Sequence, residues 1–141
     1  MLPSRTDRYT PRKAQTDLYS DFTTNFFSHP DTNQLIRVVN EDAVKRSIRN
    51  LIFTNNFERL FQPEFGGNIQ KYLFEDVSSH TEGSLIMRIK NVINQHEPRA
   101  NLIDVLVQGV PEQNGYYITI IFSITSSVNP ITMNLTLGRI R

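Results

Sequence analysis

The sequence predicts an α+β fold, with two main helices plus a short helix packed on a mostly antiparallel β-sheet in a single domain. Three observations support this prediction. The central part of the chain has apolar residues at helical spacing, the last third has apolar residues at every second position, and an Asn-Gly pair lies within that last third. Helices that are separate in sequence from antiparallel strands are typical of the α+β class.

The first main helix is expected over residues 41–53. Asn40 is its expected N-cap, and Glu41 and Asp42 suit the positive end of the helix dipole. Apolar residues recur on one face at i, i+4, i+7 and i+8, and the pattern ends after residue 53. This stripe consists of Val44, Ile48, Leu51 and Ile52.

Two further helices are expected after the Gly66-Gly67 pair. The first is short and begins near Ile69. The second is long, with Ser84 as its expected N-cap, and Pro98 ends it because proline disfavours helical geometry at the preceding residue and has no N–H to donate. Its expected inner face consists of Leu85, Ile86, Ile89, Val92, Ile93 and His96.

The strands are expected at both ends of this helical region. Residues 18–27 and 35–39 predict two strands on its N-terminal side, separated by a turn at 28–31. Residues 100–108 predict a third, and Asn114-Gly115 is a strong signal for a hairpin. The alternating apolar residues after it are Tyr116, Ile118, Ile120, Phe122 and Ile124, followed by Ile131, Met133, Leu135 and Leu137.

Composition excludes several classes of protein. Lys+Arg 15 against Asp+Glu 14 gives a net charge of +1, which offers no overall attraction for nucleic acid or an anionic membrane. The absence of cysteine excludes disulfides and thiol catalysis, and no apolar run is long enough for a spanning helix. The polar N-terminus does not resemble a secretory signal. We therefore expect a soluble protein that is made and kept in a reducing cytoplasm.

The chain is expected to divide into a tail and a domain. Residues 1–17 have four basic and two acidic residues, contain two prolines and offer little that can pack. They predict an extended tail that is disordered in the free protein and either orders against a neighbouring subunit or remains a frayed terminus. Residues 18–141 form the expected α+β domain.

The residues that could carry chemistry do not form a recognisable catalytic pattern. His29, His80 and His96 lack the spacing of metal ligands, so no metal is expected, and no motif predicts a cofactor. Glycoside hydrolysis needs two facing carboxylates, but the chain has no tryptophan to bind sugar rings. The carboxylates that could serve by residue type are Glu64, Glu75, Asp76, Glu82 and Glu97.

The most specific local feature is Glu97-Pro98-Arg99, at the end of the second long helix. Adjacent residues point in different directions where the chain turns, so the two charges need not pair with each other. Arginine can bind a carboxylate or backbone carbonyls of a partner in a planar fork. The alternative is a helix stop with solvent-exposed charges. Arg46 and Arg49, on the first helix, face either a protein partner or water.

The segment 43–75, AVKRSIRNLIFTNNFERLFQPEFGGNIQKYLFE, followed by Glu97-Pro98-Arg99, resembles the baseplate wedge proteins of contractile phage tails. The same family includes the baseplate subunit TssE of type VI secretion systems. The resemblance lies in the order of four motifs: a Lys-Arg-Ser-Ile-Arg-Asn helix, a Pro-x-Phe-Gly loop at 63–66, Leu-Phe-Glu at 73–75, and Glu-Pro-Arg. It extends from about Leu18 to the last strand. Within the loop, Phe65 is expected to close the core.

The resemblance implies a structural, non-enzymatic role in the virion tail baseplate, assembled in the host cytoplasm. Family members lie around the tail tube in six-fold arrangement and contact a helical core bundle of larger wedge proteins through the Glu-Pro-Arg motif. Glu97 and Arg99 would be the anchoring charges, with Pro98 setting their geometry. The domain is similar to the part of the sheath protein through which sheath subunits exchange strands, which implies that it templates the first sheath ring.

Two alternatives remain open at this stage. The first is the type VI secretion counterpart, which gene neighbourhood would distinguish. The second is a lysozyme-like cell-wall hydrolase, which would lose activity when a carboxylate such as Glu75 or Glu97 is removed.

Overall fold

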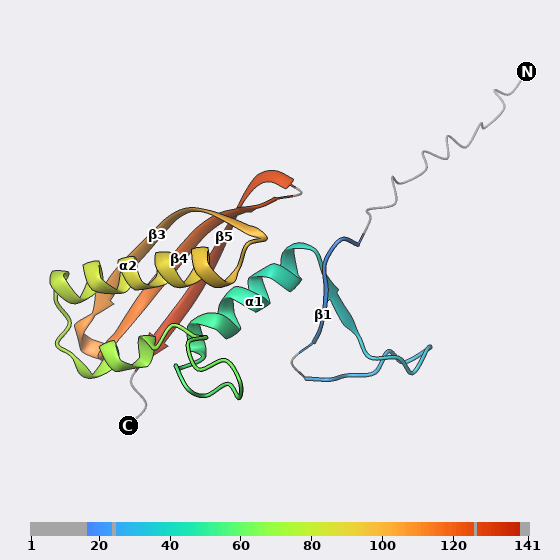
Figure 1. The fold of residues 1–141 in the computed structure, drawn as a ribbon, viewed down its shortest axis with the longest axis horizontal. Coiled ribbons are helices and arrows are strands. Elements are labelled where there is room, and N and C mark those ends of the chain that lie inside the picture. Colours follow the sequence, from blue (N-terminus) through green and yellow to red (C-terminus); the bar gives the residue numbers. More distant parts are fainter. Residues whose placement is uncertain (1–16, 24, 126, 139–141) are drawn as a thin grey trace, which may run out of the picture.

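The structure is a computed structural model that describes residues 17–23, 25–125 and 127–138. It confirms the α+β class, with two long helices and two antiparallel sheets (Figure 1). The expected tail lies outside the described residues except for Asp17. In chain order the elements are β1 (Ser20–Phe22), β2 (Arg37–Val39), α1 (Glu41–Phe53), η1 (Ile69–Phe74), α2 (Ser79–His96), β3 (Ala100–Val110), η2 (Pro111–Gln113), β4 (Gly115–Ile124) and β5 (Ser127–Gly138).

The larger sheet has the order β3-β4-β5 and is antiparallel throughout. The predicted hairpin joins β3 to β4, where Asn114 adopts a left-handed conformation with φ 44° after the short turn η2. The predicted alternation is also confirmed, because every second residue of β4 from Tyr116 to Ile124 is buried. Each strand of this sheet therefore has one buried face and one more exposed face.

Both long helices cover the same face of the larger sheet (Figure 1). The predicted stripe on α1 is confirmed, because all four of its residues are buried. On α2 the inner face is confirmed except that Ile86 and His96 are only partly buried. These residues and the inward side chains of β3, β4 and β5 form one apolar core. The short helix after the glycines is also confirmed and is a 3₁₀ helix, η1.

The predicted start of α2 is wrong. The helix begins at Ser79, not after Ser84, and Ser78 is its N-cap, with Oγ accepting a hydrogen bond of 3.3 Å from the Thr81 N–H. Thr81 is buried, and its hydroxyl donates to the carbonyl of Asp76 over 3.0 Å. The end of α2 at His96, before Pro98, is as predicted. No helix in the described part of the chain combines the length and apolar character that crossing a membrane requires.

The N-terminal strands are shorter than predicted. Ser20–Phe22 pairs with Arg37–Val39, and a single isolated bridge joins Ser28 to Leu35. We call the described residues from 17 to 40 the arm, which extends away from the larger sheet beyond α1 (Figure 1).

Asn40 is the N-cap residue of α1, as predicted, and its carbonyl accepts the first helical hydrogen bond, from Val44 at 3.1 Å, but its side chain does not cap the helix. Its side chain makes no cap hydrogen bond, and Oδ1 instead accepts from the N–H of Leu18 at 3.0 Å. The backbone of Asn40 therefore begins the helix, while its side chain anchors the arm.

Candidate interaction site

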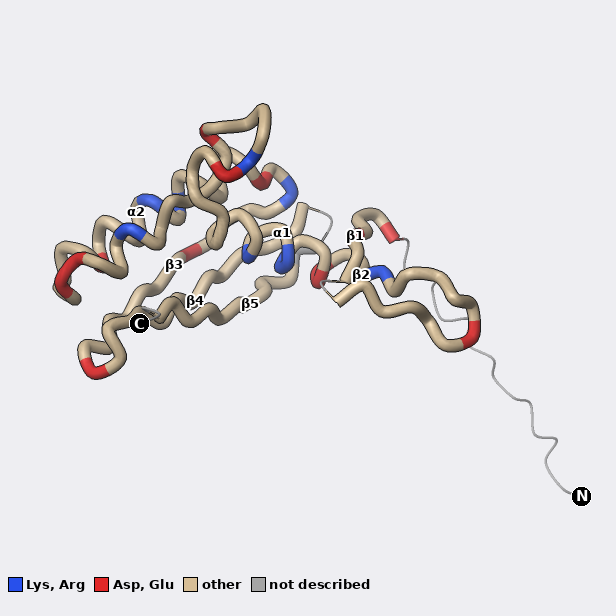
Figure 2. Tube along the Cα trace, turned by 90° about the horizontal axis from the view of Figure 1, so that it is seen from below, with Lys and Arg blue, Asp and Glu red and all other residues tan. Residues whose placement is uncertain are grey.

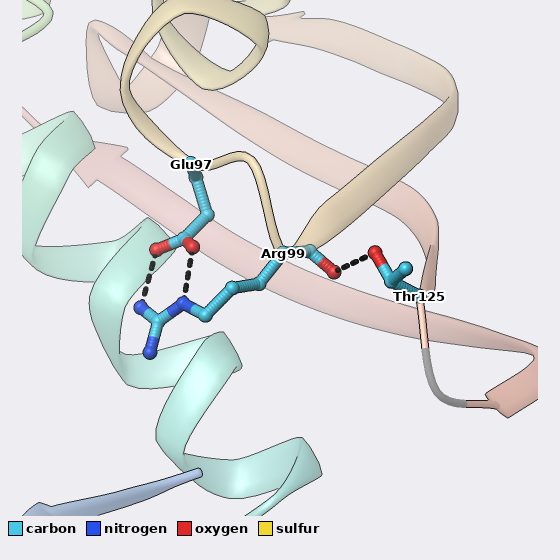
Figure 3. A network of polar contacts seen from close by, with 3 residues as sticks. All are labelled: Glu97, Arg99 and Thr125. Atoms are coloured by element: carbon cyan, nitrogen blue, oxygen red, sulfur yellow. Dashed lines mark hydrogen bonds and ion pairs between the residues drawn. The ribbon is translucent and has the colours of Figure 1, made fainter. Parts of the chain in front are cut away.

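Glu97 and Arg99 form a two-pronged ion pair just after α2 (Figure 3). Arg99 Nε lies 2.6 Å from Glu97 Oε1, and Nη2 lies 2.7 Å from Oε2. The Glu97 side chain is 3% exposed, whereas that of Arg99 is 35% exposed. The view that the two charges need not pair is therefore wrong, and so is the alternative of solvent-exposed charges for Glu97.

The pair is electrostatically stabilised in its charged form. Burial raises the pKa of Glu97, but hydrogen bonds from Arg99 and Ser47 and the positive charge of Arg99 outweigh it, so the pKa lies below its ordinary value. The pKa of Arg99 is raised, and its hydrogen bond to Glu97 is the largest cause. Glu97 therefore remains an anion at neutral pH and fixes the orientation of the guanidinium.

The backbone around the pair is held from both sides. The N–H of Glu97 donates to the carbonyl of Ile93, the last bond of α2, and the carbonyl of Glu97 accepts from Ala100, the first residue of β3. The carbonyl of Arg99 accepts from the N–H of Thr125 at 3.1 Å and from its hydroxyl at 3.2 Å (Figure 3). Pro98 lies exposed between the two charges. The segment is thus a rigid connection between α2, the sheet and the turn after β4.

The arm contributes two residues that sequence reasoning missed. The Tyr19 ring lies 5.5 Å from Cζ of Arg99, within the range of a cation–π contact. Asp21 Oδ2 lies 3.8 Å from Nε of Arg46, and its charge also acts on Arg99. Asp21 is therefore a neighbour of both arginines, paired with Arg46 and acting on Arg99 through its charge. No local pattern points to Tyr19 or Asp21, because all of α1 and all of α2 separate them from Arg99 in the sequence.

Arg49 lies on a different part of the surface from Arg99. It lines a groove of about 530 Å³ between the arm, α1 and β5, together with Lys45 and Arg46. Figure 2 shows these basic positions of α1 beside β5. The guanidinium of Arg49 lies 5.6 Å from the Phe53 ring centroid. The predicted partner-binding residues thus divide into the segment Glu97-Pro98-Arg99 and the groove residues Arg46 and Arg49.

The remaining candidate residues do not converge. Among the described residues, no group of three His, Asp or Glu could hold a metal ion. Glu82 Oε1 accepts a 2.7 Å hydrogen bond from the N–H of Gly109, a structural contact at the start of α2. Phe65 is not part of the buried core, contrary to expectation. Its ring is partly exposed, packs edge-on against His96 and lies 4.0 Å from the guanidinium of Arg59.

Comparisons with known proteins point to one family. A family model described as "Baseplate wedge protein gp25" matches residues 38–129, which include α1 and the Glu97–Arg99 pair. The baseplate wedge protein gp25 of Enterobacteria phage T4 is 28% identical over 89 residues, covering 63% of this chain and 67% of its own length.

Two solved structures are similar in fold. One is a chain of the six-fold symmetrised baseplate of the anti-feeding prophage, with a TM-score of 0.60 and 22% identity, covering 85% of each chain. The other is a crystal structure from Geobacter sulfurreducens described as a candidate tail lysozyme, with a TM-score of 0.65 and 22% identity, covering 74% of this chain and 96% of the other. The family model matches more than half of the sequence, so this chain belongs to the baseplate wedge protein family and is a structural protein of a contractile tail system.

Proposed function

We propose that this protein is a non-enzymatic baseplate component that binds the helical core bundle of neighbouring wedge proteins through Glu97, Pro98 and Arg99. We further propose that it templates the first ring of the tail sheath around the tube. The observation that carries the first proposal is the geometry of the ion pair, in which a buried carboxylate holds a partly exposed guanidinium in one orientation.

The guanidinium keeps binding capacity after it has paired with Glu97. An arginine side chain has five N–H donors, and Glu97 accepts from Nε and Nη2. Within the described part of the chain, no other hydrogen bond to this guanidinium is present, and the side chain is 35% exposed. Its remaining donors can therefore bind carboxylates or the carbonyl groups at a helix end. Because the Arg99 side chain is already ordered, it loses less conformational entropy when a partner binds.

The proposed sheath contact rests on the larger sheet. Its order is β3-β4-β5, so among the described residues one side of β5 has no neighbouring strand. An open edge accepts an added strand through main-chain hydrogen bonds, and such an edge is an aggregation liability unless an assembly covers it. The six-fold symmetry of the anti-feeding prophage baseplate supports several copies around one axis.

The carboxylates give no support for hydrolysis. A glycosidase acid has a raised pKa and faces a second carboxylate across the scissile bond. The pKa of Glu97 is instead lowered, and both of its oxygens are bound by Arg99. We expect the purified protein to leave the turbidity of a peptidoglycan suspension unchanged. Clearing that disappears with Glu75→Gln would overturn the non-enzymatic assignment.

The bundle contact is tested by co-purification with the other wedge proteins, with circular dichroism as the check on folding. Arg99→Ala should remove the association, and Arg99→Lys should weaken it, because lysine keeps the charge but loses the planar fork. Lys71→Ala, which removes an exposed cation from η1, is the matched control and should bind normally. Binding of folded Arg99→Ala at the wild-type level would remove the motif from the proposal.

The sheath role is tested by negative-stain microscopy of particles assembled without this protein. We expect capsids without attached tails or tail tubes without sheath. Normal contractile tails that fail only at infection would overturn the proposal.

A further inference from the structure

The loop between α1 and η1 presents three large apolar side chains to solvent. Phe57 is 83% exposed, Leu60 79% and Phe61 96%, and we call these three residues the tip. The loop that carries them is the green segment that leaves the end of α1 (Figure 1). Single exposed apolar residues are ordinary on a protein surface, whereas a group of large ones marks a site of contact.

The backbone of the tip adopts a conformation that costs free energy. Phe57 has φ 69° and Phe61 has φ 66°, both in the left-handed region that bulky side chains rarely adopt. Neither ring gains burial in return, because both are exposed. Backbone strain that packing does not offset is typical of functional segments.

Hydrogen bonds within the loop hold the tip in place. The N–H of Phe57 donates to the carbonyl of Pro63 at 3.0 Å. The carboxylate of Glu58 accepts from the N–H of Asn55 at 2.7 Å and from its side-chain amide at 2.8 Å. The tip is therefore preorganised, so it loses little conformational entropy when a partner covers it.

The charges beside the tip are engaged within the loop. Glu58 is bound by Asn55, and Arg59 Nη1 donates to Gln62 Oε1 at 3.2 Å. The guanidinium of Arg59 also lies 4.0 Å from the centroid of the Phe65 ring. What the tip itself offers to a partner is therefore apolar surface.

The base of the loop continues into the Glu97-Pro98-Arg99 segment. The Phe65 ring packs edge-on against His96, with 5.2 Å between the ring centroids. His96 is the last residue of α2 and directly precedes Glu97. Phe65 and His96 are partly exposed and Pro98 is exposed, so they join the tip to the proposed bundle contact as one surface.

The size of the tip indicates what kind of partner covers it. Two phenylalanines bury about 300–500 Å², whereas a stable interface needs roughly 800 Å² on each partner. The tip is therefore too small to hold a second copy of this chain by itself. It fits the role of an aromatic anchor in a larger interface, where a few such residues supply most of the binding free energy.

We infer that Phe57, Leu60 and Phe61 insert into an uncharged apolar hollow on the same neighbouring wedge protein that Glu97, Pro98 and Arg99 contact. This inference rests on the proposed function for the identity of the partner. It deepens that function by adding a second contact of different chemistry, apolar where the first is ionic.

The double variant Phe57→Asn/Phe61→Asn tests the inference in the full-length protein. Asparagine adopts the left-handed conformation more readily than phenylalanine, so the variant should unfold at an equal or higher urea concentration than wild type. Its affinity for the immobilised complex of the other wedge proteins, measured by biolayer interferometry, should nevertheless fall at least about tenfold, because aromatic anchors are removed. Leu106→Ala, which removes an exposed apolar side chain from β3, is the control and should bind normally. Wild-type affinity of the double variant, or a loss of its stability, would overturn the inference.

Salt separates this contact from the ionic one. The loss caused by the double variant should be the same at low and high salt, whereas the loss caused by Arg99→Ala should shrink at high salt, because salt screens exposed charges. A tip effect that also shrinks would contradict the apolar assignment. If Arg99→Ala binds normally and the double variant does not, the motif fails and the tip stands, and the reverse result removes the tip alone.

Crosslinking identifies the occupant in the assembled particle. An aromatic photo-crosslinking amino acid replaces Phe61, and mass spectrometry identifies the joined peptide. A crosslink to an apolar segment of another wedge protein supports the inference. Crosslinks to a second copy of this chain, to the sheath or tube protein or to lipid, or no crosslink at all, would overturn it.

Discussion

The burial of Glu97 predicts a specific cost for removing its partner. Arg99→Ala leaves a carboxylate that is 3% exposed without its cation and with Ser47 as a remaining hydrogen-bond donor. Breaking a fully buried pair costs about 3–5 kcal/mol, and the 35% exposure of Arg99 reduces this, so we expect a loss of about 2 kcal/mol in the free energy of unfolding at pH 7. For a chain of this size, that loss lowers the midpoint of thermal unfolding by about 6 °C.

The pH dependence distinguishes this mechanism from a general packing defect. The pKa of Glu97 is lowered in the folded wild-type protein, so the pair's contribution is present above the unfolded-state pKa and is lost as pH falls through the folded-state pKa. In Arg99→Ala, burial without the cation raises the pKa of Glu97. The carboxylate then takes up a proton as pH falls, and the penalty disappears.

The assay is urea denaturation followed by circular dichroism at pH 7 and pH 4. The stability difference between wild type and Arg99→Ala should be clearly smaller at pH 4. Glu97→Gln/Arg99→Ala, which removes the buried charge, should recover at least half of the loss at pH 7. Equal differences at both pH values, or a double variant as unstable as the single one, would refute the reasoning.

Three other substitutions test the fold on which the site depends, each by the same denaturation assay at pH 7. Gly66→Ala should cost at least about 2 kcal/mol, because Gly66 has φ +117° and a Cβ would collide with the carbonyl oxygen of Thr54; an unaffected midpoint would contradict this. Ser78→Ala should cost about 1 kcal/mol through loss of the cap on α2, and Ser84→Ala, inside the helix, should cost less. Ile89→Ala, at a fully buried position, should cost about 2–5 kcal/mol, whereas the exposed Met87→Ala on the same helix should have little effect.

The sequence predicted the core because periodicity reports directly on which face is buried. The stripe containing Val44 and Ile48, and the alternation along β4, follow from helical and strand geometry alone. The start of α2 was missed because its first turn is polar and gives no apolar period before Leu85. That turn is stabilised by contacts outside the helix, including the bond from Gly109 to Glu82, and these depend on the tertiary fold.

The Glu97–Arg99 pair was missed for a different reason. Two residues separated by one proline can point together or apart, and the outcome depends on how the backbone is held between α2 and β3. Here the carbonyl of Arg99 is bound by Thr125, which fixes the chain direction after Pro98. Thr125 is distant in sequence, so the motif could be identified as important while its geometry could not be predicted.

The side chain of Asn40 shows how the arm and the interaction surface depend on each other. An asparagine before two acidic residues favours a helix cap, but Asn40 has φ 50° and uses its side chain to bind the backbone at Leu18. This anchor places Tyr19 against Arg99 and Asp21 against Arg46. Neighbouring sequence predicts a side chain's role poorly where that side chain binds a residue outside its own helix or strand. Most of the arm lies outside the family match, whereas Arg46 and Arg99 lie within it. Asn40 thus fixes the arm against these two basic residues.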